Sequence, residues 1–323
     1  MYIGITIGDP SGVGPEITLK ALANHPEYLN LAIVFGSKQV IDYYHDALKI
    51  NSPINYIEEV TQFKKDHINV LYIEDIKFSE AQIGLVNAES GNAAFGYVEA
   101  AIKQAMQEKI GLVITGPLNK EALNLAGYPY DGHTEIFAEL TGTKKYTMML
   151  WSEQLAVVHV STHVSLSRAC ELVTKERVME CIDLANAALK RLGIDQPKIA
   201  VAGLNPHSGE SGLFGNEEAD EIIPAIKAKK DQGIHVTGPI SPDIAFLKAY
   251  QGDFDIVVAM YHDQGHIPMK LLAFDSGVNV TLGLPIIRTS VDHGTAFDIA
   301  GQGIASELSL VEAIKLGNRF IAE

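Results

Sequence analysis

Short apolar runs alternate with amphipathic helical patterns along nearly the whole chain, and this alternation constrains the fold more than any single motif. Most of the apolar runs lack polar alternation, which is typical of strands buried on both faces of a sheet. The predicted strands are 2–7, 31–35, 70–73, 112–115, 147–150, 156–160, 198–202, 256–260 and 279–282. Strands that alternate with helices in this way predict α/β layers with a largely parallel sheet.

Helix start and stop signals separate these strands. Ser90 is positioned to cap a helix whose apolar stripe contains Phe95, Val98, Ile102 and Met106. Thr174 is positioned to cap a second helix that ends at Gly193. The last helix is expected to open with a capping box at Ser309-x-x-Glu312.

The length of 323 residues exceeds the usual size of one hydrophobic core, so we expect two domains. No linker or internal repeat divides the chain, which favours domains joined by strands or short turns. We expect a first domain of residues 1–125 plus 265–323 and a second of 126–264. Ligands of such sheets bind beyond the carboxyl ends of the strands.

Composition excludes several classes of protein. The formal charge of −15 argues against a nucleic-acid surface, although a local basic cluster would still attract an anionic substrate. No apolar run approaches the roughly 20 residues that span a bilayer, and the N-terminus lacks a basic leader. Cys170 and Cys181 have the character of small core residues in a reducing compartment. These features predict a cytoplasmic protein that binds neither membrane nor nucleic acid.

Residues 260–301 carry an unusual concentration of functional side chains. His262, His266, His293, Lys270 and Arg288 are all expected in loops that follow strand-like runs. Such groups contribute little to an apolar core. They suit a pocket that holds a metal and a small anion.

Three histidines at predicted strand ends are the candidate metal ligands. His163, His207 and His262 each follow a buried strand, and three imidazoles with an open position form a known catalytic arrangement. His159 is set aside because, on one strand face, it lies about 13 Å from His163. Each histidine taken singly is more often an ordinary hydrogen-bonded residue, so spacing alone leaves the trio unproven.

The segment from His262 to His266 superficially resembles the H-E-x-x-H motif of zinc proteases. That motif requires a helix to bring its two histidines onto one face. Gly265 and Pro268 are expected to break a helix here, which argues against a protease.

Lys270 and Arg288 are candidates for gripping a phosphate or carboxylate, and the turn 131–135 adds donors before a helix. The alternative is that both are solvated surface charges.

The glycine-rich turn 8–16 matches neither the G-x-G-x-x-G pattern nor the P-loop pattern. A tight turn with Pro15 in the first helical turn is at least as good an interpretation as a ligand contact.

Taken together, several segments resemble the 4-hydroxythreonine-4-phosphate dehydrogenase family of vitamin B6 synthesis. They are GDPSGVGPE, ITGPLNKEAL, DGHTEIFAELTG, STHVSL, GLNPHSGESG, GPISPD, AMYHDQGHIPMK and GVNVTLGLPIIRTSVDHGTAFDIAG, in the family's order. The resemblance covers nearly the whole chain and is specific as a set. It implies two α/β/α domains around a cleft, as in isocitrate and isopropylmalate dehydrogenases. It also implies a homodimer, with the active site at the subunit interface, and NAD binding without the Rossmann fingerprint.

The resemblance also assigns residues. It places the metal ligands on His163, His207 and His262, and the substrate contacts on His133, Thr134, Lys270, Asn279 and Arg288. VDHGTAFDIAG resembles an adenosine-binding loop, which places His293, Gly294 and Asp298 near the cofactor. Asp243, Asp263 and Lys270 are candidates for proton transfer, and either aspartate is alternatively an orienting residue.

The implied reaction is NAD- and metal-dependent oxidation of the C3 hydroxyl of a 4-phosphorylated four-carbon acid, followed by decarboxylation. GYPYDGHTE, VHVSTHVSL and QGHIPMKLLAFDSGVNV look closer to a branch that oxidises D-threonate or D-erythronate 4-phosphate. The group at substrate C2, the metal (zinc, magnesium, manganese or cobalt) and NAD versus NADP stay open. A metal-dependent phosphatase and a non-catalytic sugar-acid binding protein are the alternatives of other classes.

Overall fold

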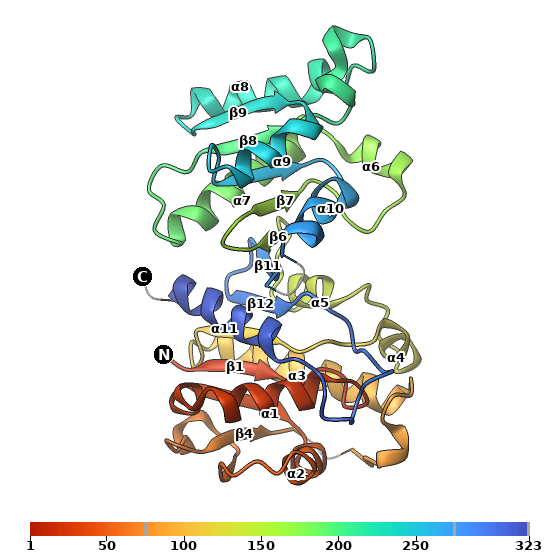
Figure 1. The fold of residues 1–323 in the computed structure, drawn as a ribbon, viewed down its shortest axis with the longest axis vertical. Coiled ribbons are helices and arrows are strands. Elements are labelled where there is room, and N and C mark those ends of the chain that lie inside the picture. The colour runs from red at the N-terminus through yellow and green to blue at the C-terminus, as the bar shows by residue number, and fades with distance from the viewer. Residues whose placement is uncertain (74–75, 274–275, 322–323) are drawn as a thin grey trace. The chain divides into compact units, whose positions relative to one another are not determined.

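The computed structural model describes residues 1–73, 76–273 and 276–321. The chain divides into two compact units, each built of strands and helices (Figure 1). Unit 1 comprises residues 1–144 and the chain from Leu284 through the C-terminal helix, and unit 2 comprises Lys145–Gly283. In the part of the chain that the structure describes, no helix is both long and apolar enough to span a membrane.

Unit 1 contains a parallel sheet. Its strands are β1 (Ile3–Thr6), β2 (Ala32–Gly36), β3 (Ile54–Ile57), β4 (Ile68–Tyr72), β5 (Leu112–Thr115) and β12 (Ile287–Val291). They lie in the order β3-β4-β2-β1-β5-β12, and every neighbouring pair is parallel. The carboxyl ends of these strands therefore share one edge, which is where ligands of such sheets bind.

The helices of unit 1 cover this sheet. They are α1 (Gly14–Asn24), α2 (Lys38–Ala47), α3 (Ala88–Met106), α4 (Lys120–Leu125), α5 (His133–Leu140) and α11 (Leu308–Ile321), with short helical turns η1 (Pro26–Asn30), η2 (Val60–Gln62) and η3 (Glu80–Gln82). α3 packs on β1, β2 and β5, and α11 packs on β12 and β5. A Cβ on Gly317 of α11 would lie 2.3 Å from Leu112, so glycine is what allows this helix to approach β5 so closely.

Unit 2 contains a mixed sheet. Its strands are β6 (Thr147–Trp151), β7 (Ala156–His159), β8 (Ile199–Ala202), β9 (Val236–Ile240), β10 (Ile256–Ala259) and β11 (Val278–Leu282), in the order β11-β6-β7-β10-β8-β9. β6 runs antiparallel to β11 and β7, whereas β7, β10, β8 and β9 are parallel. The carboxyl ends of β7, β10 and β8 consequently lie side by side.

The helical elements of unit 2 are α6 (Leu166–Leu172), α7 (Lys175–Arg191), η4 (Pro206–Gly212), η5 (Glu218–Ile222), α8 (Ile223–Asp231), α9 (Pro242–Tyr250) and α10 (His262–Ala273). A core between the sheet and the helices α9 and α10 contains Val157, Val257, Phe246 and Met269. Burial of such side chains contributes about 1.5–3 kcal/mol each relative to exposure. This core fixes α10 against the strands whose ends carry the histidines.

The predicted α/β class is confirmed, and each of the nine predicted strands is present. Three further strands were not predicted. β3 and β9 lie at the ends of the strand orders, where polar residues and Pro239 are tolerated because one edge needs no partner. β12 is fully buried, but it contains Arg288 and Ser290, and these polar residues make its sequence look like an exposed segment.

Helix caps follow local chemistry only in part. Thr174 accepts a hydrogen bond from the backbone N–H of Arg177 at the start of α7, as predicted. The cap of α3 is Asn87 rather than Ser90, since the Asn87 side chain accepts from the Ser90 N–H over 2.8 Å. Ser309 lies inside α11, which begins at Leu308, so the expected capping box at its start is wrong.

The prediction that Gly265 and Pro268 break a helix is also wrong, because α10 runs through both residues. A Cβ on Gly265 would lie 2.4 Å from Nε2 of His159 and 2.7 Å from Val157, so glycine is required for α10 to dock on β7. Burial of Met269 against the sheet compensates for the hydrogen bond that Pro268 cannot make. Tertiary packing thus overrides the local signals.

Several side chains expected in loops lie in regular elements. His262, His266 and Lys270 belong to α10, and Arg288 belongs to β12, whereas His293 lies in a loop after β12 as expected. His163 follows a buried strand as predicted, but it does not share a strand face with His159, since β7 ends at His159.

Candidate active site

A pocket in unit 2, with a volume of about 470 Å³, is lined by His163, His262 and Asp263. His163 follows β7 in the loop before α6, and His262 begins α10 just after β10. Because β7 and β10 are adjacent parallel strands, their carboxyl ends bring the two histidines together. Their ring centroids lie 5.7 Å apart. Two of the three predicted metal ligands therefore face one pocket.

The ring of His262 is oriented from two directions. Its Nδ1 is hydrogen-bonded to Oδ1 of Asp263 at 2.7 Å, which leaves Nε2 for another ligand. The ring of His266 stacks on it with a centroid separation of 3.6 Å and an interplanar angle of 13°. Nδ1 of His266 is in turn hydrogen-bonded to the carbonyl oxygen of His262 at 3.1 Å. A carboxylate that orients a histidine in this way is typical of metal sites.

His159 extends this row of imidazoles into the core. Its side chain is fully buried, and its ring centroid lies 4.8 Å from that of His266. Burial lowers the pKa of His159 to about 3, and the neighbouring His266 acts in the same direction. His159 is therefore a neutral, fully buried core residue at neutral pH.

His207 lies apart from the other two predicted ligands. It projects from η4 after β8, is exposed, and has its ring centroid 6.3 Å from that of Phe214. Among residues 1–73, 76–273 and 276–321 no group of three or more histidine, cysteine or acidic side chains is close enough to hold a metal ion. A single chain thus presents the pair His163 and His262, with His207 elsewhere on unit 2.

The remaining predicted residues of unit 2 have defined surroundings. Asp243 lies in the first turn of α9, and its Oδ1 accepts a hydrogen bond from the Ser241 hydroxyl over 2.6 Å. Asn279 lies on β11 and donates from Nδ2 to the sulfur of Met148. Its buried Oδ1 has no hydrogen-bond partner among the described residues, so it is available to a ligand. Lys270 lies in α10 and is partly buried.

A second cluster, in unit 1, contains His133 and Arg288. Arg288 is 3% exposed, donates from Nη2 to the Thr115 hydroxyl over 2.8 Å, and lies over the ring of Phe137 at 5.6 Å. Burial lowers the pKa of Arg288 to about 9, which still leaves it charged at neutral pH. Burial, and then the charge of Arg288, hold the pKa of His133 well below its ordinary value. A buried cation beside a neutral imidazole is an arrangement that suits an anionic ligand.

The start of α5 contributes to the same cluster. His133 and Thr134 are its first residues, so both lie at the positive end of the helix dipole. The buried Nε2 of His133 has no partner among the described residues. The structure therefore brings three of the five predicted substrate contacts together in unit 1.

The predicted cofactor residues lie in the loop after β12. His293 has Nδ1 hydrogen-bonded to the carbonyl oxygen of Gly294, and a Cβ on Gly294 would meet nothing within 4 Å. Asp298 follows in the same loop. The backbone carbonyl of Thr295 accepts from the N–H of Val13, so this loop packs on the glycine-rich turn before α1.

That turn contains a buried acid whose importance the sequence did not indicate. Asp9 is fully buried, and its Oδ1 accepts from the N–H of Ser11 over 2.8 Å. Burial raises the pKa of Asp9 to about 6. Pro15 lies in the first turn of α1, as the tight-turn interpretation expected. The sequence pattern does not predict this burial, because the GDPSG motif is typical of an exposed turn.

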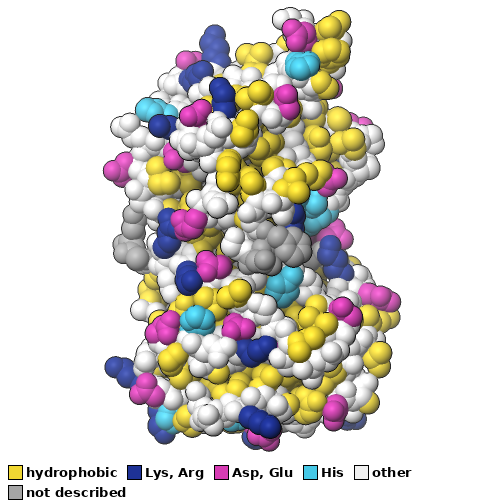
Figure 2. All heavy atoms as spheres, viewed as in Figure 1, with side chains coloured by type: hydrophobic (Ala, Val, Ile, Leu, Met, Phe, Trp, Pro, Cys, Tyr) yellow, Lys and Arg dark blue, Asp and Glu magenta, His cyan; other side chains and the backbone are white. Residues whose placement is uncertain are grey.

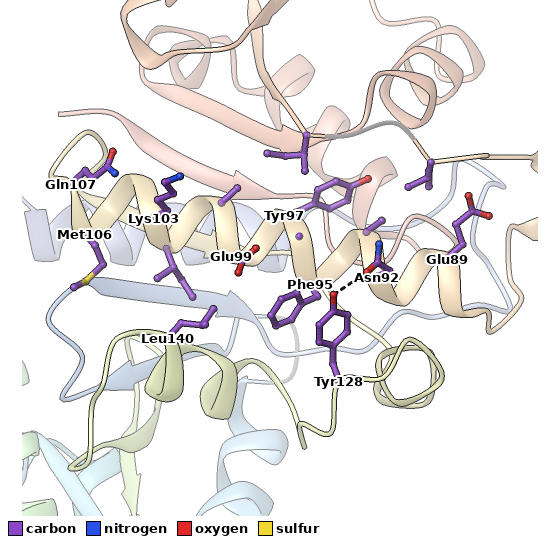
Figure 3. A pocket seen from close by; sticks show the side chains of 16 residues that line it. Glu89, Asn92, Phe95, Tyr97, Glu99, Lys103, Met106, Gln107, Tyr128 and Leu140 are labelled. Carbon is purple, nitrogen blue, oxygen red and sulfur yellow. Dashed lines mark hydrogen bonds between the residues drawn. The ribbon is translucent and has the colours of Figure 1, made fainter.

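A groove larger than the histidine pocket lies elsewhere, along α3 of unit 1 (Figure 3). It has a volume of about 970 Å³ and is lined by Asn92, Phe95, Glu99, Lys103 and Tyr128, among others. The Tyr128 hydroxyl donates to Asn92 over 2.9 Å, and its ring stacks on Phe95. None of the predicted site residues lines this groove, so size does not identify the reaction centre.

Comparison with known proteins identifies the family. The family model described as "Pyridoxal phosphate biosynthetic protein PdxA" matches residues 28–317. The chain belongs to the PdxA family. The strands, helices and histidine pair described above are therefore those of a PdxA protein.

Two relatives and one solved structure match this PdxA protein over almost its whole length. D-threonate 4-phosphate dehydrogenase of Salmonella typhimurium is 46% identical over 97% of each chain. The protein of the same name from Pectobacterium atrosepticum is 44% identical, again over 97% of each chain. The crystal structure of 4-hydroxythreonine-4-phosphate dehydrogenase from Klebsiella pneumoniae has a TM-score of 0.87, with 43% identity over 99% of both chains.

These similarities make this PdxA protein an oxidoreductase, a dehydrogenase of a 4-phosphorylated hydroxy acid. His159 and His266 are the side chains around the predicted pair that sequence analysis left without a role. The four-residue spacing of His262 and His266 could have predicted that their rings lie side by side, because residues four apart share a helix face. Pro268 hid this relationship, because a proline argues against a helix here.

Proposed function

We propose that the chain oxidises the C3 hydroxyl of D-threonate 4-phosphate or a close analogue, with NAD as oxidant and a divalent metal, and that the product loses carbon dioxide. The observation that carries this proposal is the convergence of His163 and His262 on one pocket, with Asp263 bonded to Nδ1 of His262. The names of relatives 44–46% identical to the chain supply the substrate class.

The donor set suits a divalent transition metal. Neutral imidazoles suit zinc, whereas magnesium and manganese favour oxygen ligands. His163 and His262 would hold the ion, and His207 is the proposed third ligand. When bound, the ion supplies Lewis-acid polarisation of the substrate hydroxyl, and NAD supplies the hydride acceptor.

The residues of the chain bind and orient the substrate in this proposal. Arg288 and His133, with Thr134, bind an anionic end of the substrate, since the guanidinium is charged and the buried imidazole nitrogen needs a partner. Asn279 offers an unpaired amide oxygen, and Lys270 offers a further charge. Positioning of this kind contributes several kcal/mol to catalysis, on the order of 7–11 kcal/mol at most. His293, Gly294 and Asp298 are the proposed cofactor contacts.

Three side chains are candidates for proton transfer. Asp263 already accepts from His262, which favours an orienting role for this carboxylate. Asp243 accepts from Ser241 and Lys270 lies on the same helix as His262. The pH dependence of single-turnover hydride transfer in Asp243→Asn, Asp263→Asn and Lys270→Met separates them, because loss of the base removes the corresponding ionisation from the profile.

Decarboxylation follows from the carbon skeleton. Oxidation at C3 places a carbonyl β to the C1 carboxylate, so loss of carbon dioxide leaves a three-carbon ketone phosphate. A hydroxyl at C2 yields a hydroxyketone and an amino group yields an aminoketone. The product therefore reports which of the two related substrates is used.

We also propose that the enzyme is a cytoplasmic homodimer in which the partner subunit completes the metal site. His207 lies apart from the His163 and His262 pair within one chain. Hydrophobic side chains gather over α9 and α10 (Figure 2). Exposed apolar residues on these helices include Ile244, Leu247, Ile267 and Leu271, the last of them 81% exposed. A patch of this kind is typical of a protein interface.

The test is NADH formation followed by absorbance, with D-threonate 4-phosphate, D-erythronate 4-phosphate and 4-hydroxythreonine 4-phosphate assayed side by side. We expect turnover that is lost after metal chelation and restored by added Zn²⁺, Mn²⁺ or Co²⁺. We expect carbon dioxide and NADH in equal amounts. Phosphate release without NAD would instead show a hydrolase, and binding without turnover would show a non-catalytic protein.

A further inference from the structure

The turn that carries His207 has an unusual backbone. His207, Ser208, Gly209, Glu210 and Ser211 have φ values of 51°, 52°, 81°, 42° and 56°. Four of these five residues have side chains, and the left-handed region is unfavourable for all except glycine. Consecutive residues in this region persist only when the surrounding structure holds them. The contacts around the turn should therefore reveal what holds it.

Glu218 holds one side of the turn. It is 3% exposed, and its Oε1 accepts hydrogen bonds from the backbone N–H groups of Leu204 at 2.8 Å and Asn205 at 2.7 Å. Its Oε2 accepts from Nδ2 of Asn205 at 2.9 Å. A Cβ on Gly209 would lie 2.8 Å from the same Oε2. The carboxylate thus fixes the backbone before His207 and also contacts the middle of the turn.

Gln264 holds the segment from the other side. Its side chain is buried in α10 and donates from Nε2 to the carbonyl oxygen of Gly203 at 2.8 Å. Its Oε1 accepts from the backbone N–H of Met260 at 2.7 Å. One side chain therefore joins the end of β8, which leads to His207, to the end of β10, which leads to His262.

Close packing leaves this segment little freedom. A Cβ on Gly203 would lie 2.8 Å from Oγ of Ser208 and 2.9 Å from its Cα, so the turn folds back directly onto the chain that leads to it. Three donors converge on the Glu218 carboxylate, and hydrogen bonds to an ionised acceptor are the stronger kind. The contacts with Glu218 and Gln264 offset the unfavourable backbone of the turn.

We infer that Glu218 and Gln264 form a polar clamp that sets the direction in which His207 projects and ties it to the segment carrying His262. Both are positioning residues, because neither side chain belongs to the predicted ligand set. The metal-related part of this inference rests on the proposed function. The clamp involves residues of unit 2 only and does not depend on a bound metal. The clamp and the proposed metal site can therefore be tested separately.

The clamp is tested with Glu218→Gln and Gln264→Met in the full-length protein. Both preserve side-chain volume, and each removes or weakens the hydrogen bonds described above. The matched control is Glu217→Gln, which makes the same charge change one residue away. Glu217 accepts from Nδ2 of Asn205 at 2.7 Å and, among the described residues, from neither backbone amide.

The first readout is amide hydrogen exchange in peptides covering residues 203–212, measured without metal. We expect exchange at Leu204 and Asn205 to accelerate at least tenfold in Glu218→Gln and less than threefold in Glu217→Gln. Unchanged exchange in both clamp variants would overturn the clamp. If Glu218→Gln does not fold, Glu218→Asp and Gln264→Met provide the same comparison.

The second readout is Zn²⁺ affinity by titration calorimetry. We expect Glu218→Gln to weaken Zn²⁺ binding about 10–100-fold, as outer residues of metal sites do, with the control close to wild type. Accelerated exchange with unchanged affinity would show that the clamp does not position His207. If His207→Ala itself retains full Zn²⁺ affinity and turnover, the proposed ligand set fails while the exchange result for the clamp still stands.

Discussion

The ring of His266 lies against the ring of His262, with centroids 3.6 Å apart and planes inclined by 13°. The two residues are four positions apart on α10, so they share one face of the helix. The ring of His266 thus packs against one face of His262, a predicted metal ligand, while Asp263 is hydrogen-bonded to Nδ1 of His262. This relationship leads to the first prediction.

His266→Ala should weaken divalent metal binding because His262 loses the surface that limits its ring rotation. We expect a decrease in Zn²⁺ affinity of about tenfold, in the range found for outer residues of metal sites. The measurement is calorimetric titration of the metal-free protein. His235→Ala, at an exposed position, is the control. Wild-type affinity in His266→Ala would assign the stacking to packing alone.

Gly265→Ala should destabilise unit 2, because the added Cβ would lie 2.4 Å from Nε2 of His159 and 2.7 Å from Val157. Overpacking of this kind costs about 1–3 kcal/mol in the free energy of unfolding. Gly96→Ala in α3 is the matched control, since its Cβ would meet Ile73 at an ordinary 3.8 Å. Denaturant unfolding measures both. Equal stability of the two variants would contradict the close docking of α10 on β7.

Arg288→Lys should raise KM for the phosphorylated substrate while the enzyme stays folded. Lysine keeps the charge but loses the planar fork and the hydrogen bond to Thr115. A charged hydrogen bond contributes about 1.5–3 kcal/mol, so we expect KM to rise roughly 10–100-fold. Initial-rate kinetics measure this, with the exposed Arg168→Lys as control. An unchanged KM would place Arg288 outside the substrate site.

Asp9→Asn should stabilise the protein at neutral pH and have little effect in acid. Burial raises the pKa of Asp9 from 3.8 to about 6, so the folded protein favours the protonated carboxyl. The contribution of the wild-type Asp9 carboxyl to the free energy of unfolding is most favourable below pH 3.8, and this contribution is lost as pH rises through about 6. We expect a gain of about 1–3 kcal/mol at pH 7.5.

Thermal or denaturant unfolding of Asp9→Asn at pH 4 and pH 7.5 tests this dependence. Asparagine keeps the oxygen that accepts from the Ser11 N–H. Asp195→Asn, at an exposed position, is the control and should change stability equally little at both pH values. A gain that is the same at pH 4 and pH 7.5 would show that the Asp9 carboxyl does not titrate in this window.

Leu271→Asp should dissociate the proposed homodimer, because it places a charge on the exposed apolar face of α10. Sedimentation at micromolar protein should show a monomer with little NAD-dependent activity, since His207 of the partner subunit would be lost from the site. Leu125→Asp, at an exposed position of unit 1, is the control. A fully active monomer would contradict a shared site.

Much of the architecture was predictable because it depends on local pattern. Uninterrupted apolar runs such as 112–115 and 256–260 form strands in the structure. A strand buried on both faces has no solvent-exposed face, so its sequence lacks alternating polar residues. β12 escaped prediction because the charge of Arg288 is buried beside Thr115, a partner far away in sequence. Pattern rules assume that a charge is exposed.

The sequence by itself determined the α/β class and the family and supplied the candidate metal-binding histidines, because strand periodicity and motif order are local properties of the chain. Only the tertiary structure decided that α10 continues through Pro268, that His163 and His262 face one pocket, and that His207 projects from a left-handed turn. These outcomes depend on contacts between distant segments, such as Gly265 with His159 and Glu218 with Leu204. The energy of such contacts exceeds local preference, and no local pattern records it.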